Sequence, residues 1–132
     1  MTRKNSSEIG IWGEKEAEEV LKAGGYKILG RRVRIGDRDE IDLVARDGDV
    51  LVFVEVKTRR SADFGRPASA VDRDKRHTMS RAAVRYLKQT GCPKVNFRFD
   101  VVEVIGSADG AKPVVNHIEN AFTLDRCYSL PC

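Results

Sequence analysis

Cysteine and long apolar runs are scarce in this sequence. Of its 132 residues only three are cysteine, Cys92, Cys127 and Cys132, spaced irregularly and accompanied by neither a CxxC pair nor a histidine cluster. Such a set indicates a reducing compartment. No segment approaches the length needed to span a bilayer, and the basic residues near the start are not followed by an apolar signal-peptide core. We therefore expect a cytoplasmic protein that does not enter a membrane.

Aromatic side chains, histidine and net charge are also limited. Aromatic residues make up 7%, and we expect the one tryptophan, Trp12, to anchor the core or its rim, because base-stacking surfaces usually present several aromatics. The two histidines, His77 and His117, stand alone and are expected at the surface or in packing. A net charge of +4 with a pI near 9.1 is compatible with a polyanionic partner but is too small to identify one.

The remaining composition is that of one compact domain, which we expect to span residues 1–132. Hydrophobic residues make up 41% and charged residues 33%, as in globular proteins with a charged surface. Apolar spacing predicts helices over residues 7–23 and 68–90. Extended segments are predicted over residues 26–33, 40–45, 50–57, 96–105 and 114–122, with a surface turn over residues 106–113. This order predicts an α/β fold with a mixed sheet flanked by helices.

Two charged residues interrupt the most apolar of these segments. Residues 52–60 read VFVEVKTRR, in which residues typical of a buried strand surround Glu55 and Lys57. Because an unpaired buried charge is very unfavourable, such groups usually pair, bind a metal or line the rim of a cleft. The simplest alternative is a solvated strand end with a weak ion pair, which would contribute about 0–1 kcal/mol.

A hairpin turn links this strand to a second acidic one. Residues 46–49 read RDGD, and an Asp-Gly pair between two apolar runs is a strong hairpin signal. If that pair forms a two-residue loop, residues whose numbers sum to 95 lie opposite, so that Asp42 faces Phe53 and Glu40 faces Glu55. Asp42 and Glu55 would then be diagonal neighbours on one face, roughly 7–8 Å apart at the backbone. A loop one residue longer would place them on opposite faces.

Carboxylates at such range favour a bound cation. They repel each other unless a proton or a metal intervenes, and oxygen-only ligands favour Mg²⁺ or Mn²⁺. Lys57, two residues beyond Glu55 on the same face, could hold or deprotonate a metal-bound water, or stabilise the negative charge of a pentavalent phosphorane. This combination is typical of phosphodiester hydrolysis.

The same motifs resemble a known superfamily. Asp42 in IDLVA, followed by EVK at residues 55–57 on the next strand, resembles the PD-(D/E)XK nucleases, which have the restriction-endonuclease-like fold. More narrowly, the chain resembles the YraN-like family of uncharacterised bacterial proteins over roughly residues 10–122. The matching pieces are GE-x-x-A at residues 13–17, EIDL at 40–43, FVEVKTR at 53–59, FG-x-P at 64–67, Ala70-Val71, Lys75, RFDVV at 98–102 and NAF at 120–122.

The resemblance implies a metal-dependent DNA endonuclease. It makes Asp42 and Glu55 metal ligands, together with a backbone carbonyl near Val56, and it makes Lys57 the catalytic lysine that orients the attacking water. Glu14 would be the helix carboxylate that archaeal Holliday-junction resolvases bring to the same site. A branched DNA junction is then the leading substrate, and a homodimer would let so small an enzyme hold a long substrate.

One position departs from the family pattern. The family usually has glycine directly before the EIDL motif, whereas this chain has Asp39, which adds a carboxylate and stiffens a loop expected to approach DNA. The role of the neighbouring Glu40 therefore stays open.

Basic side chains would supply the contacts to phosphate. The helix over residues 68–90 is predicted to be apolar on one side and basic on the other, a pattern most often explained by solubility. Lys75 falls on the apolar side, where it either snorkels to solvent or reaches the site and touches a phosphate. The residues expected to contact DNA are Arg59, Arg60, Arg73, Lys75, Arg81 and Arg85.

Two other functions stay open at this point. The chain could be a non-catalytic nucleic-acid-binding or adaptor protein that keeps the fold without turnover, because fold and motif do not demonstrate a rate. The nuclease could also act on RNA. Metal-dependent cleavage that is lost on replacing Asp42 would separate the enzyme from the adaptor, and parallel cleavage of DNA and RNA would decide the substrate.

Overall fold

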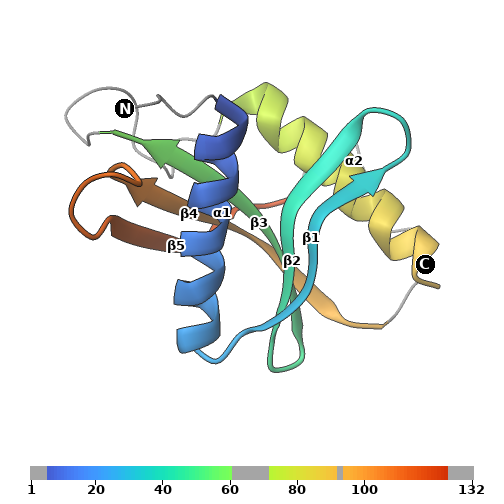
Figure 1. Ribbon diagram of the computed structural model, residues 1–132. Helices are drawn as coiled ribbons and strands as arrows, with labels where there is room; N and C mark the ends of the chain where they lie inside the picture. Colours follow the sequence, from blue (N-terminus) through green and yellow to red (C-terminus); the bar gives the residue numbers. More distant parts are fainter. Residues whose placement is uncertain (1–5, 61–71, 92–93, 125–132) are drawn as a thin grey trace.

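Two helices and five strands make up the described part of the chain. The computed structural model describes residues 6–60, 72–91 and 94–124. The elements are α1 (Ser6–Ala23), β1 (Lys27–Ile35), β2 (Asp39–Asp47), β3 (Val50–Arg59), α2 (Arg73–Gln89), β4 (Asn96–Ile105) and β5 (Val114–Phe122), as Figure 1 shows. Each predicted element is therefore present, and the predicted α/β architecture with a mixed sheet and flanking helices is confirmed.

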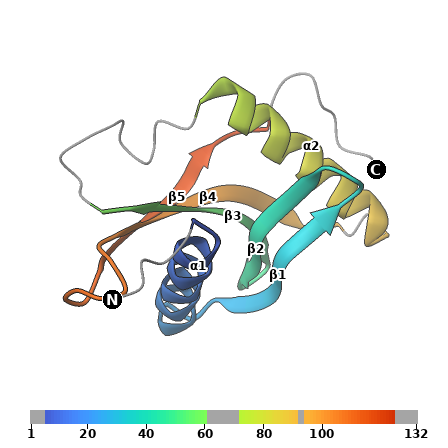
Figure 2. The same ribbon diagram turned by 45° about the horizontal axis from the view of Figure 1, so that its top comes forward.

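The strands form one sheet in the order β1-β2-β3-β4-β5. Neighbours are antiparallel except β3 and β4, which run parallel and are connected through α2. Figure 2 shows α1 on one face of this sheet and α2 on the other. Side chains alternate along β3, so that Val52 and Val54 pack in the core cluster of α1 while Leu51 and Phe53 pack in the cluster of α2. The central strand is therefore covered on both faces.

The second helix begins later than the sequence pattern predicted. Asp72 has an extended backbone and caps the helix, because its Oδ1 accepts a hydrogen bond from the Lys75 N–H at 2.8 Å. The helix therefore starts at Arg73, not at residue 68, and residues 68–71 lie outside the described part of the chain. The apolar periodicity continues on both sides of Asp72, so it could not show that the helix begins after this residue. The helix start is decided by the N-cap hydrogen bond of the Asp72 side chain.

The register of the β2–β3 hairpin differs from the expected one. Asp47 pairs with Val50 and Leu43 with Val54, so the loop consists of Gly48 and Asp49, and opposite residues sum to 97 rather than 95. Gly48 occupies the first loop position with φ of 58°, a left-handed conformation that glycine adopts without strain. The expected pairing of Asp42 with Phe53 was wrong. A shift by two residues keeps every side chain on its face, however, so Asp42 and Glu55 come closer rather than being separated.

No helix among the described residues is long and apolar enough to cross a membrane. The longest, α1, has 18 residues and carries several charged side chains.

Candidate active site

β2 and β3 separate at Asp42. β2 stays paired with β1 as far as Asp39, whereas its pairing with β3 ends at Leu43 and Val54. Beyond this point the Asp42 side chain, and not a backbone carbonyl of β2, accepts the hydrogen bond from β3. The Val56 N–H donates to the Asp42 Oδ2 at 2.8 Å. This bond fixes the carboxylate at the fork between the strands, directly beside Glu55.

Glu55 forms an ion pair with a lysine of α2. The Lys75 Nζ lies 3.2 Å from the Glu55 Oε2, and the two side chains are 38% and 14% exposed. The sequence left two positions open for Lys75, at the solvent or at the site, and the structure places it at the site. Glu55 thus has the charge of Asp42 on one side and an ammonium on the other.

Burial and neighbouring charges raise the pKa values of these two acids. Burial, followed by the charge of Glu55, raises the pKa of Asp42 to about 7, although the hydrogen bond from Val56 opposes the rise. Burial also raises the pKa of Glu55, and the positive charges of Lys75 and Lys57 oppose it. Two partly buried neighbouring carboxyl groups with raised pKa values form a site that gains from a proton or a cation.

Glu14 reaches the same fork from α1. The preceding residue, Gly13, packs so closely on β3 that a Cβ there would lie 2.2 Å from the Thr58 Oγ1. Glu14 and Asp42 line one cavity of about 260 Å³, and the charge of Glu14 contributes to the raised pKa of Asp42. The charges of two other carboxylates, Glu55 on β3 and Glu14 on α1, therefore both act on Asp42.

An arginine that sequence reasoning missed lies in this cavity. The Arg32 Nε donates a hydrogen bond to the Glu14 Oε2 at 2.7 Å, and the pKa of Arg32 is raised by this bond and by the negative charges around it. Its backbone has a φ of 45°, which is unfavourable for a bulky side chain and occurs mainly where the surroundings enforce it. The two-arginine run at residues 31–32 was the available signal, but a strand pattern does not reveal a left-handed residue.

Lys57 follows Glu55 by two positions on β3. Strand alternation places both side chains on the same face, and Lys57 is half-buried. Its positive charge opposes the rise in the pKa of Glu55, so the two groups interact. Val56, between them, points to the opposite face, where it packs with the α1 cluster, and its N–H holds Asp42.

The expected phosphate-binding arginines occupy different settings. Arg60, Arg73 and Arg85 are exposed. Arg59 forms an ion pair with Glu103 at 3.2 Å.

Arg81 donates two hydrogen bonds to Asp39, at 2.8 and 2.7 Å, and these bonds lower the pKa of that buried carboxyl. The aspartate that departs from the family pattern is therefore compensated by an arginine of α2, and Arg81 would have to exchange this partner for a phosphate.

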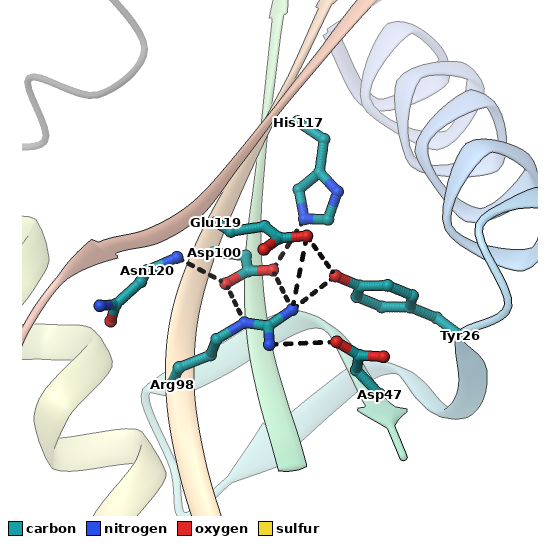
Figure 3. Close-up of polar contacts among 7 residues, drawn as sticks. All are labelled: Tyr26, Asp47, Arg98, Asp100, His117, Glu119 and Asn120. Atoms are coloured by element: carbon teal, nitrogen blue, oxygen red, sulfur yellow. Dashed lines mark hydrogen bonds and ion pairs between the residues drawn. The ribbon is translucent and has the colours of Figure 1, made fainter.

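A second polar cluster lies between the sheet and the α1–β1 junction (Figure 3). Asp100 is fully buried and accepts hydrogen bonds from the Arg98 Nε at 2.9 Å and the Asn120 N–H at 3.0 Å, while the His117 Nε2 lies 2.7 Å from its Oδ2. Arg98 also donates to Asp47 at 3.2 Å. His117 was expected at the surface or in packing, and the structure adds an ionic partner that the sequence did not indicate. The cluster ties strands together and lies apart from the carboxylates at the fork.

The donor set at the fork fits a hard divalent cation in chemical type. Asp42 and Glu55 offer carboxylate oxygens, and their like charges need compensation. Among residues 6–60, 72–91 and 94–124, however, no three His, Cys, Asp or Glu side chains are arranged to enclose a metal ion. The site is therefore a pair of carboxylates that needs backbone or solvent oxygens to complete a coordination shell.

Fold and site together define an α/β protein with a mixed five-stranded sheet and a partly buried carboxylate pair at a fork between two strands. The chain belongs to the uncharacterised protein family UPF0102, whose family model matches residues 13–104. The expected YraN-like membership is thereby confirmed.

The relatives match this chain over almost its whole length. A UPF0102 protein of Symbiobacterium thermophilum is 47% identical over 117 residues, which cover 89% of this chain and 98% of the relative. A UPF0102 protein of Geobacter sulfurreducens is 44% identical over 116 residues, covering 88% and 89%. A third, from Clostridium acetobutylicum, is 40% identical over 121 residues, covering 90% and 97%.

Proposed function

We propose that this protein is a divalent-cation-dependent DNA endonuclease of the PD-(D/E)XK superfamily, with a restriction-endonuclease-like fold. The observation that carries the proposal is the carboxylate pair at the strand fork, where the pKa of Asp42 is raised to about 7 beside Glu55 and a lysine follows two residues later. Perturbed acids gathered with a lysine are typical of a catalytic site, whereas a solvated strand end would leave both acids near their ordinary pKa.

The roles follow from the chemistry of each group. Asp42 and Glu55 would hold a Mg²⁺ or Mn²⁺ ion, with a backbone carbonyl near Val56. The bound ion would neutralise charge on the scissile phosphate and activate water. Lys57 lies on the face of Glu55, where its ammonium orients the attacking water and offsets the charge of the phosphorane. Glu14, held by Arg32, would complete the acidic site from α1.

DNA is the proposed substrate, and a branched junction is the leading form of it. Exposed Arg60, Arg73 and Arg85 are available for phosphate contacts. The similarity of the acidic motif to that of archaeal Holliday-junction resolvases favours the junction, and a homodimer would place two such sites on one substrate.

Cleavage of a labelled panel tests this function. Single-stranded, duplex, flap and four-way-junction DNA and an RNA oligomer are incubated with wild-type protein in Mg²⁺, Mn²⁺ or EDTA. Lys57→Ala serves as the site variant and Lys27→Ala, an exposed lysine at the start of β1, as the matched control. We expect metal-dependent cutting by the wild type and by Lys27→Ala, reduced at least about 100-fold in Lys57→Ala.

Two outcomes would overturn the proposal. Equal cutting by all three proteins would assign the activity to a contaminant or to another site. Metal-independent DNA binding without any cutting would instead favour a non-catalytic adaptor.

A further inference from the structure

Lys75 is an unusual residue for its position in α2. It lies in the first turn, two residues after Arg73, where the helix dipole favours negative rather than positive side chains. Its backbone is held by the N-cap, because the Lys75 N–H donates to Asp72 at 2.8 Å. The ion pair of its side chain with Glu55 offsets the unfavourable helix dipole at this position.

The ammonium of Lys75 occupies the position of a counter-ion to the acidic site. It lies 3.2 Å from the Glu55 Oε2, and its positive charge also acts on Asp42. On the α1 side of the fork, the Arg32 guanidinium is likewise the counter-ion of Glu14. The two carboxylates whose charges act on Asp42, Glu55 and Glu14, are thus each paired with a basic side chain, while Asp42 accepts a hydrogen bond from the Val56 N–H.

A divalent ion on Asp42 and Glu55 would exclude the ammonium from Glu55. Both cations would bind the same carboxylate group, and two positive centres so close together repel each other. Lys75 is able to leave because its side chain is 38% exposed and has several rotatable bonds, while the N-cap keeps its backbone in place. Glu55, 14% exposed, has less freedom to move.

We propose that Lys75 is an internal cation that neutralises Glu55 in the metal-free protein. A divalent ion that binds this carboxylate would displace the ammonium, which is then free to contact a phosphate of the substrate. This inference rests on the proposed metal-dependent function. In this proposal Lys75 competes with the divalent ion for Glu55, in addition to making the phosphate contact expected from the sequence.

Calorimetric titration of Mn²⁺ into the full-length protein tests the exchange. Lys75→Met removes the charge and keeps most of the length, Lys75→Arg keeps the charge, and Glu55→Gln removes the shared carboxylate. Lys22→Met is the matched control, because Lys22 also pairs with a glutamate but lies near the far end of α1. We expect Lys75→Met to bind Mn²⁺ about fivefold or more tighter than wild type, Lys75→Arg and Lys22→Met to stay within about twofold, and Glu55→Gln to bind weakly.

Amine labelling supplies a readout that does not depend on catalysis. The rate at which an acylating reagent modifies Lys75 is followed by mass spectrometry, with Lys22 as the internal reference. We expect saturating Mn²⁺ to accelerate labelling of Lys75 several-fold, and Glu55→Gln to give the fast rate without Mn²⁺.

The possible failures are distinguishable. If wild type and Lys75→Met bind Mn²⁺ equally well, the exchange is overturned and the metal site stands. If Lys75→Met binds Mn²⁺ and the wild type does not, the lysine competes strongly and the exchange is supported. If no variant binds Mn²⁺, the exchange and the metal-dependent function are overturned together.

Discussion

At the scale of single residues, Asp42 shows how a partly buried carboxyl group is accommodated at a strand fork. The Val56 N–H satisfies one of its carboxylate oxygens, yet burial and Glu55 keep its pKa near 7. An unfolded aspartic acid has a pKa of about 3.9, so between roughly pH 4 and pH 7 the Asp42 carboxyl binds a proton more readily in the folded protein than in the unfolded chain. Asp42 therefore lowers the stability of the metal-free protein as pH rises through this window.

Replacing Asp42 by asparagine should remove this loss. The amide oxygen can still accept the hydrogen bond of Val56, while the repulsion with Glu55 disappears. We expect Asp42→Asn in EDTA to melt several degrees higher than wild type at pH 8, with the difference shrinking toward zero near pH 4. Differential scanning calorimetry across this pH range measures both curves.

Two controls sharpen this result. Glu40→Gln, an exposed carboxylate on the same strand, should leave the pH profile of wild type unchanged. A stability gain for Asp42→Asn that is the same at pH 4 and pH 8 would mean that packing, and not ionisation, separates the two proteins.

At the scale of elements, the position of Glu14 depends on how closely α1 approaches β3. Gly13 makes that approach possible, because any Cβ would collide with the Thr58 hydroxyl at 2.2 Å. Gly10, one turn earlier, has room, since a Cβ there would lie 3.6 Å from the Arg32 Nη2. The two helix glycines thus differ in what lies opposite them.

The prediction compares alanine at these two positions. Gly13→Ala should destabilise the protein by about 1–3 kcal/mol, because the helix must shift away from the sheet. Gly10→Ala should be neutral or stabilising by up to about 1 kcal/mol, since alanine is favoured over glycine inside a helix. Urea unfolding gives both values.

A double variant checks the cause of the loss. Thr58→Ala removes the hydroxyl that the new methyl group would meet, so adding it to Gly13→Ala should recover a large part of the lost stability. If Gly13→Ala is as stable as Gly10→Ala, the close approach of α1 to β3 is wrong.

The bounds of helices and strands were predictable from the sequence where the apolar periodicity is strong. They were uncertain where a single residue decides the end of a helix or the register of a hairpin. β4 and β5 have the bounds that alternation gave, whereas the start of α2 depended on the Asp72 cap. The register of the β2–β3 hairpin depended on which two residues form the loop, and the left-handed Gly48 settles it. Asp42 and Glu55 were still correctly placed on one face because a two-residue shift preserves strand alternation.

At the scale of the whole molecule, the contacts that sequence reasoning missed join segments far apart in the chain. Arg98 on β4 contacts Asp47 at the end of β2 and the Tyr26 hydroxyl before β1, as Figure 3 shows. Arg32 and Arg81 likewise find their carboxylates on other elements. A sequence shows the charge of an arginine but not its partner, because partners depend on tertiary packing. Motif resemblance singled out Asp42, Glu55 and Lys57 and left Lys75 open, whereas only the structure paired Arg32 and Arg81 with their carboxylates.

Asp100 provides the test of this long-range network. Burial alone would raise the pKa of this carboxyl, but hydrogen bonds from His117, Arg98 and the Asn120 N–H hold it below its usual range. Its ionised form therefore stabilises the fold at pH above about 4, and the contribution is lost as pH falls through the lower folded pKa.

Asp100→Asn should consequently destabilise the protein by about 3 kcal/mol at pH 7, because a buried charged partner of Arg98 is removed while the arginine remains. The difference from wild type should begin to shrink below about pH 4, where the Asp100 carboxyl of the unfolded chain becomes protonated, and shrink further as pH falls through the lower folded pKa. Glu119→Gln is the matched control, since this exposed carboxylate lies 4.0 Å from the same arginine and should change stability by less than about 0.5 kcal/mol. Urea unfolding at pH 7 and pH 3.5 distinguishes the two cases: a loss for Asp100→Asn that is equal at both pH values would assign Asp100 a packing role, and the network would then stabilise the fold by shape and not by charge.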